Sequence, residues 1–171
     1  MAELAPQERL QPALLDRLTD DEPDKKVEGP DKRVLTKTQL RQAVLRDLAW
    51  LFNTTRLESE EDLSGTPLVR MSTLNYGLPA LAGETASSLD PTDLEQAVRE
   101  AIVAYEPRIL PSSLRVRTIV TETQLDQHNV ISVEIEGVLW AQPVPLELLL
   151  RTEVDLETGR VEITDLARSR A

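Results

Sequence analysis

Apolar residues recur at helical spacing in the first third of the chain. Residues 6–18 carry a leucine at every fourth position, which predicts a short amphipathic helix that needs a partner surface. Residues 37–53 carry a wider apolar face, which predicts a deeply buried helix. Thr36 with Gln39 three residues later has the form of a capping box, so we expect the second helix to begin there.

A third helix is expected to open at Asp90-Pro91, with Asp90 as its cap and Pro91 in its first turn. Its apolar face repeats at helical spacing, and Pro107 should end it because proline disfavours a helical residue before it. Residues 54–89, between the second and third helices, are expected to be mostly loop. A connection of this length is uncommon in a compact domain and is often functional.

The last third of the chain alternates apolar and polar residues with a period of two. Residues 114–120, 131–136 and 146–154 show this alternation, which is typical of half-buried antiparallel strands. Asp155–Gly159 has the composition of a hairpin turn leading into a further strand at residues 161–163. We therefore predict an α+β fold, with three helices and an antiparallel meander of about four strands.

Two regions are expected along the chain. Residues 19–35 are polar and charged, with few side chains that could enter a core, and are predicted to be a flexible linker. Residues 1–35 would then form an N-terminal helix with its linker. Residues 36–168 would form a single α+β domain.

Composition narrows the classes of partner. The 171 residues carry a net charge of −11 with a pI near 4.6, which argues against nucleic acids and anionic membranes as partners. The chain has no cysteine, which excludes disulfides and thiolate metal sites and fits a reducing cytoplasm. No apolar run approaches the ~20 residues that cross a bilayer, and the N-terminus lacks signal-peptide features, so we expect a cytoplasmic protein without membrane insertion.

The chain gives little sign of catalytic chemistry. His128 is the only histidine and is expected to lie in a loop, and neither a nucleophile-elbow motif nor a phosphate-binding loop is present. With 30 acidic residues, a carboxylate pair of the kind that glycosidases use stays open as an alternative. Sugar sites favour aromatic platforms, but Trp50, Phe52 and Tyr105 fall on predicted helices that need them for packing. We expect no enzymatic activity, no cofactor, no metal and no small-molecule substrate.

The motif Glu106-Pro107-Arg108, at the end of the third predicted helix, places a negative charge where it is electrostatically unfavourable. A carboxylate there meets the negative end of the helix dipole, so another group must offset it. One candidate is a local contact with Arg108, worth ~0–1 kcal/mol if exposed. The other is a partner chain, to which Arg108 would offer its planar fork. Both alternatives stay open on the residues alone.

Several stretches, in consistent order, resemble one known family. The resemblance extends over roughly residues 12–164, and its most specific motif is Glu106-Pro107-Arg108 preceded by Ala101-Ile102. The family is the lysozyme-like baseplate wedge family of contractile phage tails, and the closer likeness is to its TssE branch in type VI secretion systems. The remaining matching stretches are Leu14–Leu18, Leu45–Thr54, Ser72–Pro79 and Arg151–Gly159.

This resemblance implies a structural subunit, with a peptidoglycan-cleaving lysozyme-like hydrolase as the alternative. Such a subunit would join the wedge proteins TssF and TssG, and through them TssK, at the cytoplasmic side of the inner membrane. It would also provide the platform on which the contractile sheath polymerises. Carried over, the docking role falls on Glu106, Pro107 and Arg108, with Asn75 and Tyr76 as further partner-binding residues.

Two more expectations concern how partners would bind. An exposed sheet edge is a template for an added strand, so an edge of the meander is expected to accept strands from the first sheath ring. Arg108→Ala is expected to leave the fold intact and to weaken binding to the wedge.

Overall fold

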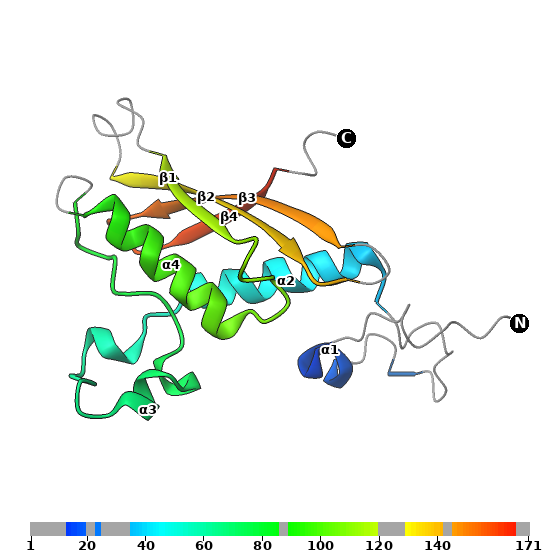
Figure 1. Ribbon diagram of the computed structural model, residues 1–171, viewed down its shortest axis with the longest axis horizontal. Helices are drawn as coiled ribbons and strands as arrows, with labels where there is room; N and C mark the ends of the chain where they lie inside the picture. The colour runs from blue at the N-terminus through cyan, green and yellow to red at the C-terminus, as the bar shows by residue number, and fades with distance from the viewer. Residues whose placement is uncertain are drawn as a thin grey trace, which may run out of the picture.

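A four-stranded antiparallel sheet with helices against one face forms the body of the computed structural model, which describes residues 13–19, 23–24, 35–85, 89–119, 129–141 and 145–166 (Figure 1). The four strands are β1 (Arg115–Ile119), β2 (Val130–Leu139), β3 (Leu146–Asp155) and β4 (Val161–Asp165). They lie in the order β1-β2-β3-β4, so every strand pairs with its neighbour in the chain. The predicted α+β fold with an antiparallel meander is confirmed.

Four α-helices and two 3₁₀ turns complete the described part of the chain. Helix α4 packs beneath β1 and α2 packs beneath β4, while α1 and α3 project from the helical side (Figure 1). The core lies between the sheet and the two long helices, where Leu48, Ile102 and Ile135 are fully buried. The elements are α1 (Leu14–Leu18), α2 (Lys37–Phe52), η3 (Leu57–Ser59), α3 (Pro67–Arg70), η4 (Thr73–Asn75) and α4 (Pro91–Tyr105).

Helix α2 begins where its capping box predicts. The Thr36 hydroxyl accepts from the backbone N–H of Gln39 at 3.2 Å, and the Gln39 side chain accepts from the backbone N–H of Thr36 at 2.9 Å. Phe52 is buried as expected, but the expectation that Trp50 packs in the core is wrong, because its side chain is 51% exposed. Trp50 lies off the buried stripe of α2, and the Arg46 guanidinium sits 5.1 Å from its ring centroid.

Helix α4 also has the predicted ends. The Asp90 carboxylate accepts from the backbone N–H of Thr92 at 2.8 Å, and Pro91 occupies the first turn. The helix ends at Tyr105, so Glu106 becomes its C-terminal cap and Pro107 follows directly. This ending turns the chain sharply and places residues 106–108 at the end of the helical layer next to α2.

The long connection from residue 54 to residue 89 contains η3, α3 and η4, so its described part is more ordered than expected. Two backbone hydrogen bonds of 2.8 Å, between Arg56 and Leu78 and between Leu78 and Thr54, fasten residue 78 to the start of the connection. Gly77 allows this approach because its φ is +126° and a Cβ there would lie 2.2 Å from the Thr54 carbonyl oxygen. The connection therefore returns to the end of α2 through a position that suits glycine.

Some sequence expectations fall outside the described residues. Of the first predicted helix, the structure describes only its last part as α1, and the linker is described at residues 19, 23–24 and 35 alone. His128 and Val120 also lie outside the described ranges. In the described part of the chain, no helix combines the length and apolar character needed to cross a bilayer.

Candidate functional site

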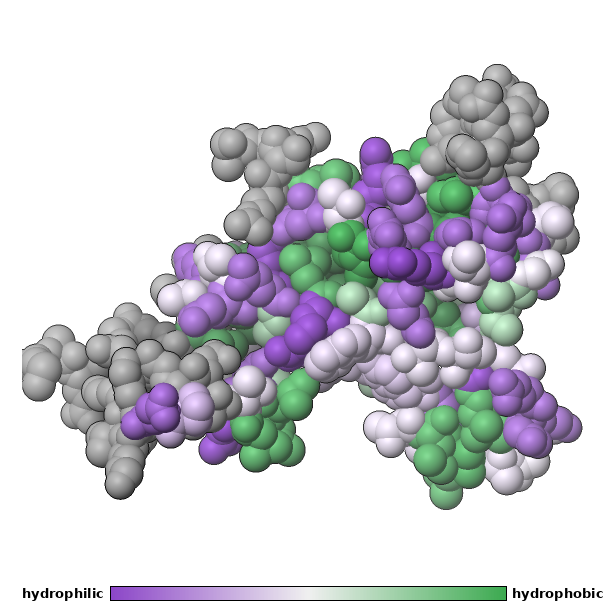
Figure 2. All heavy atoms as spheres, turned by 180° about the vertical axis from the view of Figure 1, so that it is seen from behind, coloured by the Kyte–Doolittle hydropathy of each residue, from purple (hydrophilic) through white to green (hydrophobic). Residues whose placement is uncertain are grey.

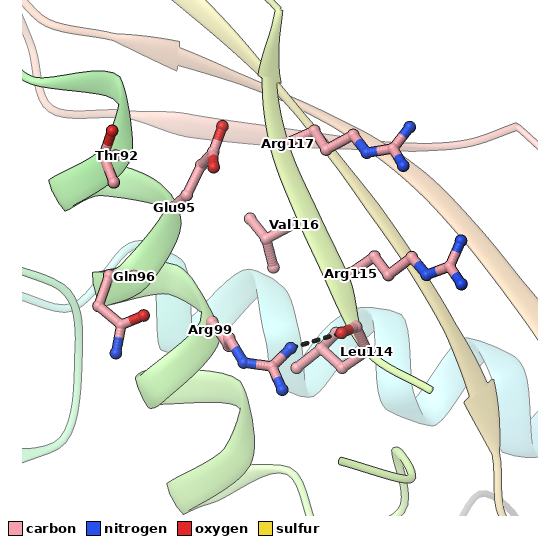
Figure 3. A pocket seen from close by; sticks show the side chains of 8 residues that line it. All are labelled: Thr92, Glu95, Gln96, Arg99, Leu114, Arg115, Val116 and Arg117. Atoms are coloured by element: carbon pink, nitrogen blue, oxygen red, sulfur yellow. Dashed lines mark hydrogen bonds between the residues drawn. The ribbon is translucent and has the colours of Figure 1, made fainter. Parts of the chain in front are cut away.

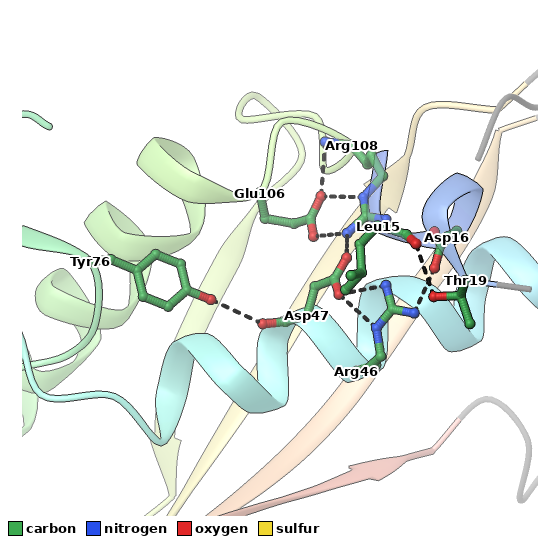
Figure 4. Close-up of polar contacts among 8 residues, drawn as sticks. All are labelled: Leu15, Asp16, Thr19, Arg46, Asp47, Tyr76, Glu106 and Arg108. Atoms are coloured by element: carbon green, nitrogen blue, oxygen red, sulfur yellow. Dashed lines mark hydrogen bonds and ion pairs between the residues drawn. The ribbon is translucent and has the colours of Figure 1, made fainter. Parts of the chain in front are cut away.

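The carboxylate of Glu106 is buried at the end of α4 and is held by Arg108 (Figure 4). Glu106 is only 3% exposed. Arg108 donates to it from Nε at 2.6 Å, from Nη2 at 2.5 Å and from its own backbone N–H at 3.1 Å. This bidentate contact supplies the positive charge that a carboxylate needs at the negative end of a helix.

Arg108 also joins α4 to α2 and, through it, to α1. Its Nη2 donates to Asp47 at 2.5 Å, and Asp47 in turn accepts from Arg46 at 2.9 Å. Arg46 then donates to Asp16 of α1 at 2.6 Å. These five residues form what we call the charge network, in which three carboxylates alternate with two guanidinium groups (Figure 4).

The neighbouring carboxylates favour the charged form of Arg108 in this network. Burial alone would lower the pKa of Arg108, but hydrogen bonding and attraction from Glu106, followed by those from Asp47, raise that pKa above its usual value. Burial, with smaller contributions from the charges of Asp47 and Glu106, raises the pKa of Tyr76, so its hydroxyl stays neutral. The Tyr76 ring packs edge-to-face on Tyr105, with ring centroids 5.1 Å apart.

A cavity of about 540 Å³ opens beside the charge network. Its floor is apolar and its far wall is formed by α1, which places Leu15 over the residues at the end of α4 (Figure 4). Pro107 is exposed at the rim, and Nη1 of Arg108 is buried without a hydrogen-bond partner among the described residues. The lining residues are Ala13, Leu15, Asp47, Leu48, Trp50, Leu51, Tyr76, Tyr105, Glu106, Pro107 and Arg108.

The structure brings four of the five predicted partner-binding residues to this cavity. Glu106, Pro107, Arg108 and Tyr76 line it, and we call the first three the corner. Asn75 does not line it: its buried amide accepts from the backbone N–H of Glu58 at 2.9 Å and donates to the Arg70 carbonyl at 3.0 Å. Asn75 thus holds the connecting loop together.

Of the two alternatives left open for Glu106, the local contact with Arg108 is present. It is a buried pair rather than an exposed one, so breaking it costs more than ~0–1 kcal/mol. Docking of a partner at the corner stays a prediction, for which Pro107 is exposed and Arg108 is partly exposed, whereas the unpaired Nη1 of Arg108 is buried.

Sequence reasoning missed Asp47 and Arg46. Both lie in the matching stretch Leu45–Thr54, and both are charged residues within a helix whose neighbouring positions are buried. A charged pair at the border of a buried helical stripe was the available signal, because such groups require counter-charges.

A second cavity, of about 350 Å³, lies between α4 and β1 (Figure 3). Glu95 of α4 accepts from the backbone N–H of Thr118 at 2.6 Å, and Arg99 donates to the Leu114 carbonyl. The side chains of Arg115 and Arg117 point away from α4 (Figure 3). Helix α4 therefore covers part of the outer backbone edge of β1.

The opposite edge of the sheet is covered in a similar way. The Asn53 side chain, at the end of α2, accepts from the backbone N–H of Val161 at 3.0 Å and donates to its carbonyl at 2.9 Å. Both outward-facing backbone groups at the start of β4 are thus occupied, so both edges carry side-chain caps.

Metal ligands do not gather at either cavity. Within the described ranges, no group of three or more His, Cys, Asp or Glu side chains is placed to hold a metal ion. The two carboxylates at the larger cavity, Asp47 and Glu106, are both bound by Arg108.

Comparison with known proteins identifies the family. The family model described as baseplate wedge protein gp25 matches residues 38–144, from the first turn of α2 past the end of β2. No curated protein matches, and no solved structure matches. The matched residues are more than half of the chain and include the corner, the smaller cavity and all of the larger cavity except Ala13 and Leu15. The chain therefore belongs to the gp25 family of baseplate wedge proteins, with a structural role among the other proteins of a phage-tail-like baseplate.

Proposed function

We propose that this chain is the TssE-type subunit of a type VI secretion baseplate. In this role it joins the wedge subunits TssF and TssG, and through them TssK, at the cytoplasmic side of the inner membrane. It also supports the first ring of the contractile sheath. The observation that carries the proposal is the corner, which lies within the matched residues and combines an exposed proline with a partly unpaired arginine beside an apolar cavity.

The geometry supports different tasks for the three corner residues. Glu106 is buried and fixes the guanidinium of Arg108 in one plane, so it is a positioning residue. The partly exposed Arg108 side chain contacts an acceptor such as a carboxylate or a helix C-terminal carbonyl of a wedge subunit. Its Nη1 is buried and has no partner among the described residues, so it joins that contact only once the groups that cover it move aside. Pro107 is exposed and offers a rigid apolar contact beside it. Leu15 of α1 lines the adjacent cavity and is 45% exposed, so it offers a further apolar contact there.

A non-catalytic role is part of the same proposal. Glycoside hydrolysis needs one carboxylic acid that holds a proton and one free carboxylate. Asp47 and Glu106 are both ion-paired with the same guanidinium, so neither is a free carboxylate. The lysozyme-like alternative instead predicts clearing of a peptidoglycan suspension by the purified protein, abolished by one carboxylate-to-amide substitution.

The sheath-platform role would use an edge of the sheet. Strand addition at β1 must displace Glu95 and Arg99, and addition at β4 must displace Asn53. Strands β3 and β4 also contribute buried core residues such as Leu150 and Val154, so a test of this role must leave both strands in place. A strand can be added only after these side-chain caps are displaced, which would protect the isolated subunit from edge-to-edge aggregation.

Arg108→Lys is expected to weaken binding to a co-expressed TssF–TssG complex by roughly tenfold while the protein stays folded. Lysine keeps a positive charge beside Glu106 but cannot reproduce the planar fork that serves Glu106, Asp47 and a partner together. Affinity is measured by titration of the immobilised complex, and folding by thermal unfolding.

The matched control is Arg151→Lys, since Arg151 is an exposed arginine that also pairs with a carboxylate, that of Glu134. This control should bind like the parent. If Arg108→Lys and the control both bind with the affinity of the parent, the corner is not part of the docking surface.

A further inference from the structure

Three large apolar side chains project into solvent from the connection between α2 and α4. Leu68, Met71 and Leu74 are 84%, 82% and 68% exposed. They come from α3, the residue after it and η4, and Figure 2 shows apolar surface on the projecting part of the molecule that these elements form. We call these three residues the apolar lobe. Such a cluster marks an interaction site when it is held in place by its surroundings.

The backbone beneath the apolar lobe is held from several sides. The buried amide of Asn75 ties η4 to η3 and α3 through Glu58 and Arg70. Arg70 forms an ion pair with the Glu58 carboxylate at 2.8 Å, and the Tyr105 hydroxyl donates to the Ser72 carbonyl at 2.9 Å. The lobe is thus organised before any partner binds, which lowers the entropic cost of association.

An acidic run borders the lobe. Glu60, Glu61 and Asp62 are exposed in the segment between η3 and α3, and polar surface adjoins the apolar projection in Figure 2. The arginines of this segment offset the run only in part, because Arg56 and Arg70 share the single partner Glu58 while three further carboxylates stay in excess over the remaining positive charge. The lobe therefore presents an apolar centre with a negatively charged border.

This charge distribution discriminates between possible occupants. Two copies packed lobe to lobe would bring two acidic borders together, and an anionic bilayer would repel the same border. A protein socket with apolar walls would bury the apolar centre of the lobe, and a rim of lysine or arginine would attract its acidic border.

We propose that the apolar lobe is a second docking surface, separate from the corner, that inserts into a basic-rimmed apolar socket of another baseplate subunit. This inference rests on the proposed function, since it takes the partner from the wedge complex. Asn75 enters as a positioning residue, because its amide orients the backbone on both sides of the lobe.

The test uses the full chain and a purified complex of TssF, TssG and TssK as the probe. The lobe variant is Leu68→Ser/Met71→Ser/Leu74→Ser, which alters only highly exposed side chains and should unfold at the parental temperature. The border variant is Glu60→Lys/Glu61→Lys/Asp62→Lys. Its matched control is Glu147→Lys/Glu153→Lys/Glu162→Lys, which makes the same charge change at exposed positions of β3 and β4.

We expect the lobe and border variants to bind the complex about tenfold or more weakly, and the control to bind like the parent. Parental binding should also weaken as salt rises, and the border variant should lose that dependence. Equal binding by parent and lobe variant overturns the inference and leaves the proposed function standing. A parent that does not bind the complex at all overturns both.

Two further measurements test the alternative occupants of the lobe, which are a second copy of this chain and an anionic membrane. If the parent sediments as a dimer and the lobe variant as a monomer, the lobe serves self-association, and the inference is overturned. Co-flotation of the parent, but not of the lobe variant, with phosphatidylglycerol vesicles would assign it to membranes and overturn it as well. We expect a monomer that does not float.

Discussion

Arg108→Ala is expected to lower the free energy of unfolding by about 2–4 kcal/mol, because it leaves Glu106 as a buried charge without a counter-charge. Glu106 is 3% exposed, and two of its three hydrogen bonds from Arg108 come from the guanidinium. The variant also frees Asp47 from the same group. Urea unfolding followed by circular dichroism measures the loss. This expectation revises the one drawn from the sequence, in which Arg108→Ala leaves the fold intact.

A double-substitution cycle separates the buried pair from other effects of the change. Adding Glu106→Gln to Arg108→Ala removes the stranded charge, so the double variant should recover at least about 1 kcal/mol relative to additivity. Arg151→Ala, which breaks the exposed pair with Glu134, should cost less than about 1 kcal/mol. A loss for Arg108→Ala no larger than that for Arg151→Ala would contradict the account of the pair.

Gly77→Ala is expected to cost roughly 3 kcal/mol or more of folding stability. The backbone at Gly77 has φ +126°, and an added Cβ would lie 2.2 Å from the Thr54 carbonyl oxygen and 3.0 Å from the backbone nitrogen of Arg56. Both atoms belong to the backbone that fastens the long connection to the end of α2, so neither can move aside cheaply. Thermal and urea unfolding measure the effect.

Gly65→Ala serves as the matched control in the same connection. An added Cβ at Gly65 meets nothing within 4 Å, and the position shows no positive φ. Its stability should change by less than about 1 kcal/mol, in either direction. If Gly77→Ala were as mild as Gly65→Ala, the close approach of residues 54 and 77 would not exist in solution.

Local signals in the sequence were sufficient for the main elements of the fold. The capping box at Thr36 and the Asp90-Pro91 start located the two long helices, since these motifs act on backbone groups within one turn. The period-two alternation located the strands, and the Asp155 turn located the last hairpin, where the Asp155 carboxylate accepts from the backbone N–H of Glu157 at 2.8 Å.

The candidate site was only partly accessible to the same reasoning. The motif at residues 106–108 could be found, but not its burial, because that depends on Asp47, 61 residues before Arg108 in the chain. Trp50 was misplaced because apolar spacing gives the centre of a buried stripe but not which flank a neighbour covers. The apolar lobe was not predicted, although its residues recur at every third position, because they come from separate short turns and project into solvent rather than into the core.

Electron cryo-microscopy of this chain co-expressed with TssF, TssG and TssK tests most directly whether the corner docks on the wedge. We expect a complex in which the chain is bound at the wedge, with Pro107 and Arg108 against helices of TssF or TssG. The Glu106–Arg108 pair should be intact in that complex. A complex that lacks the chain, or one in which the corner faces solvent while other surfaces make every contact, would contradict the account.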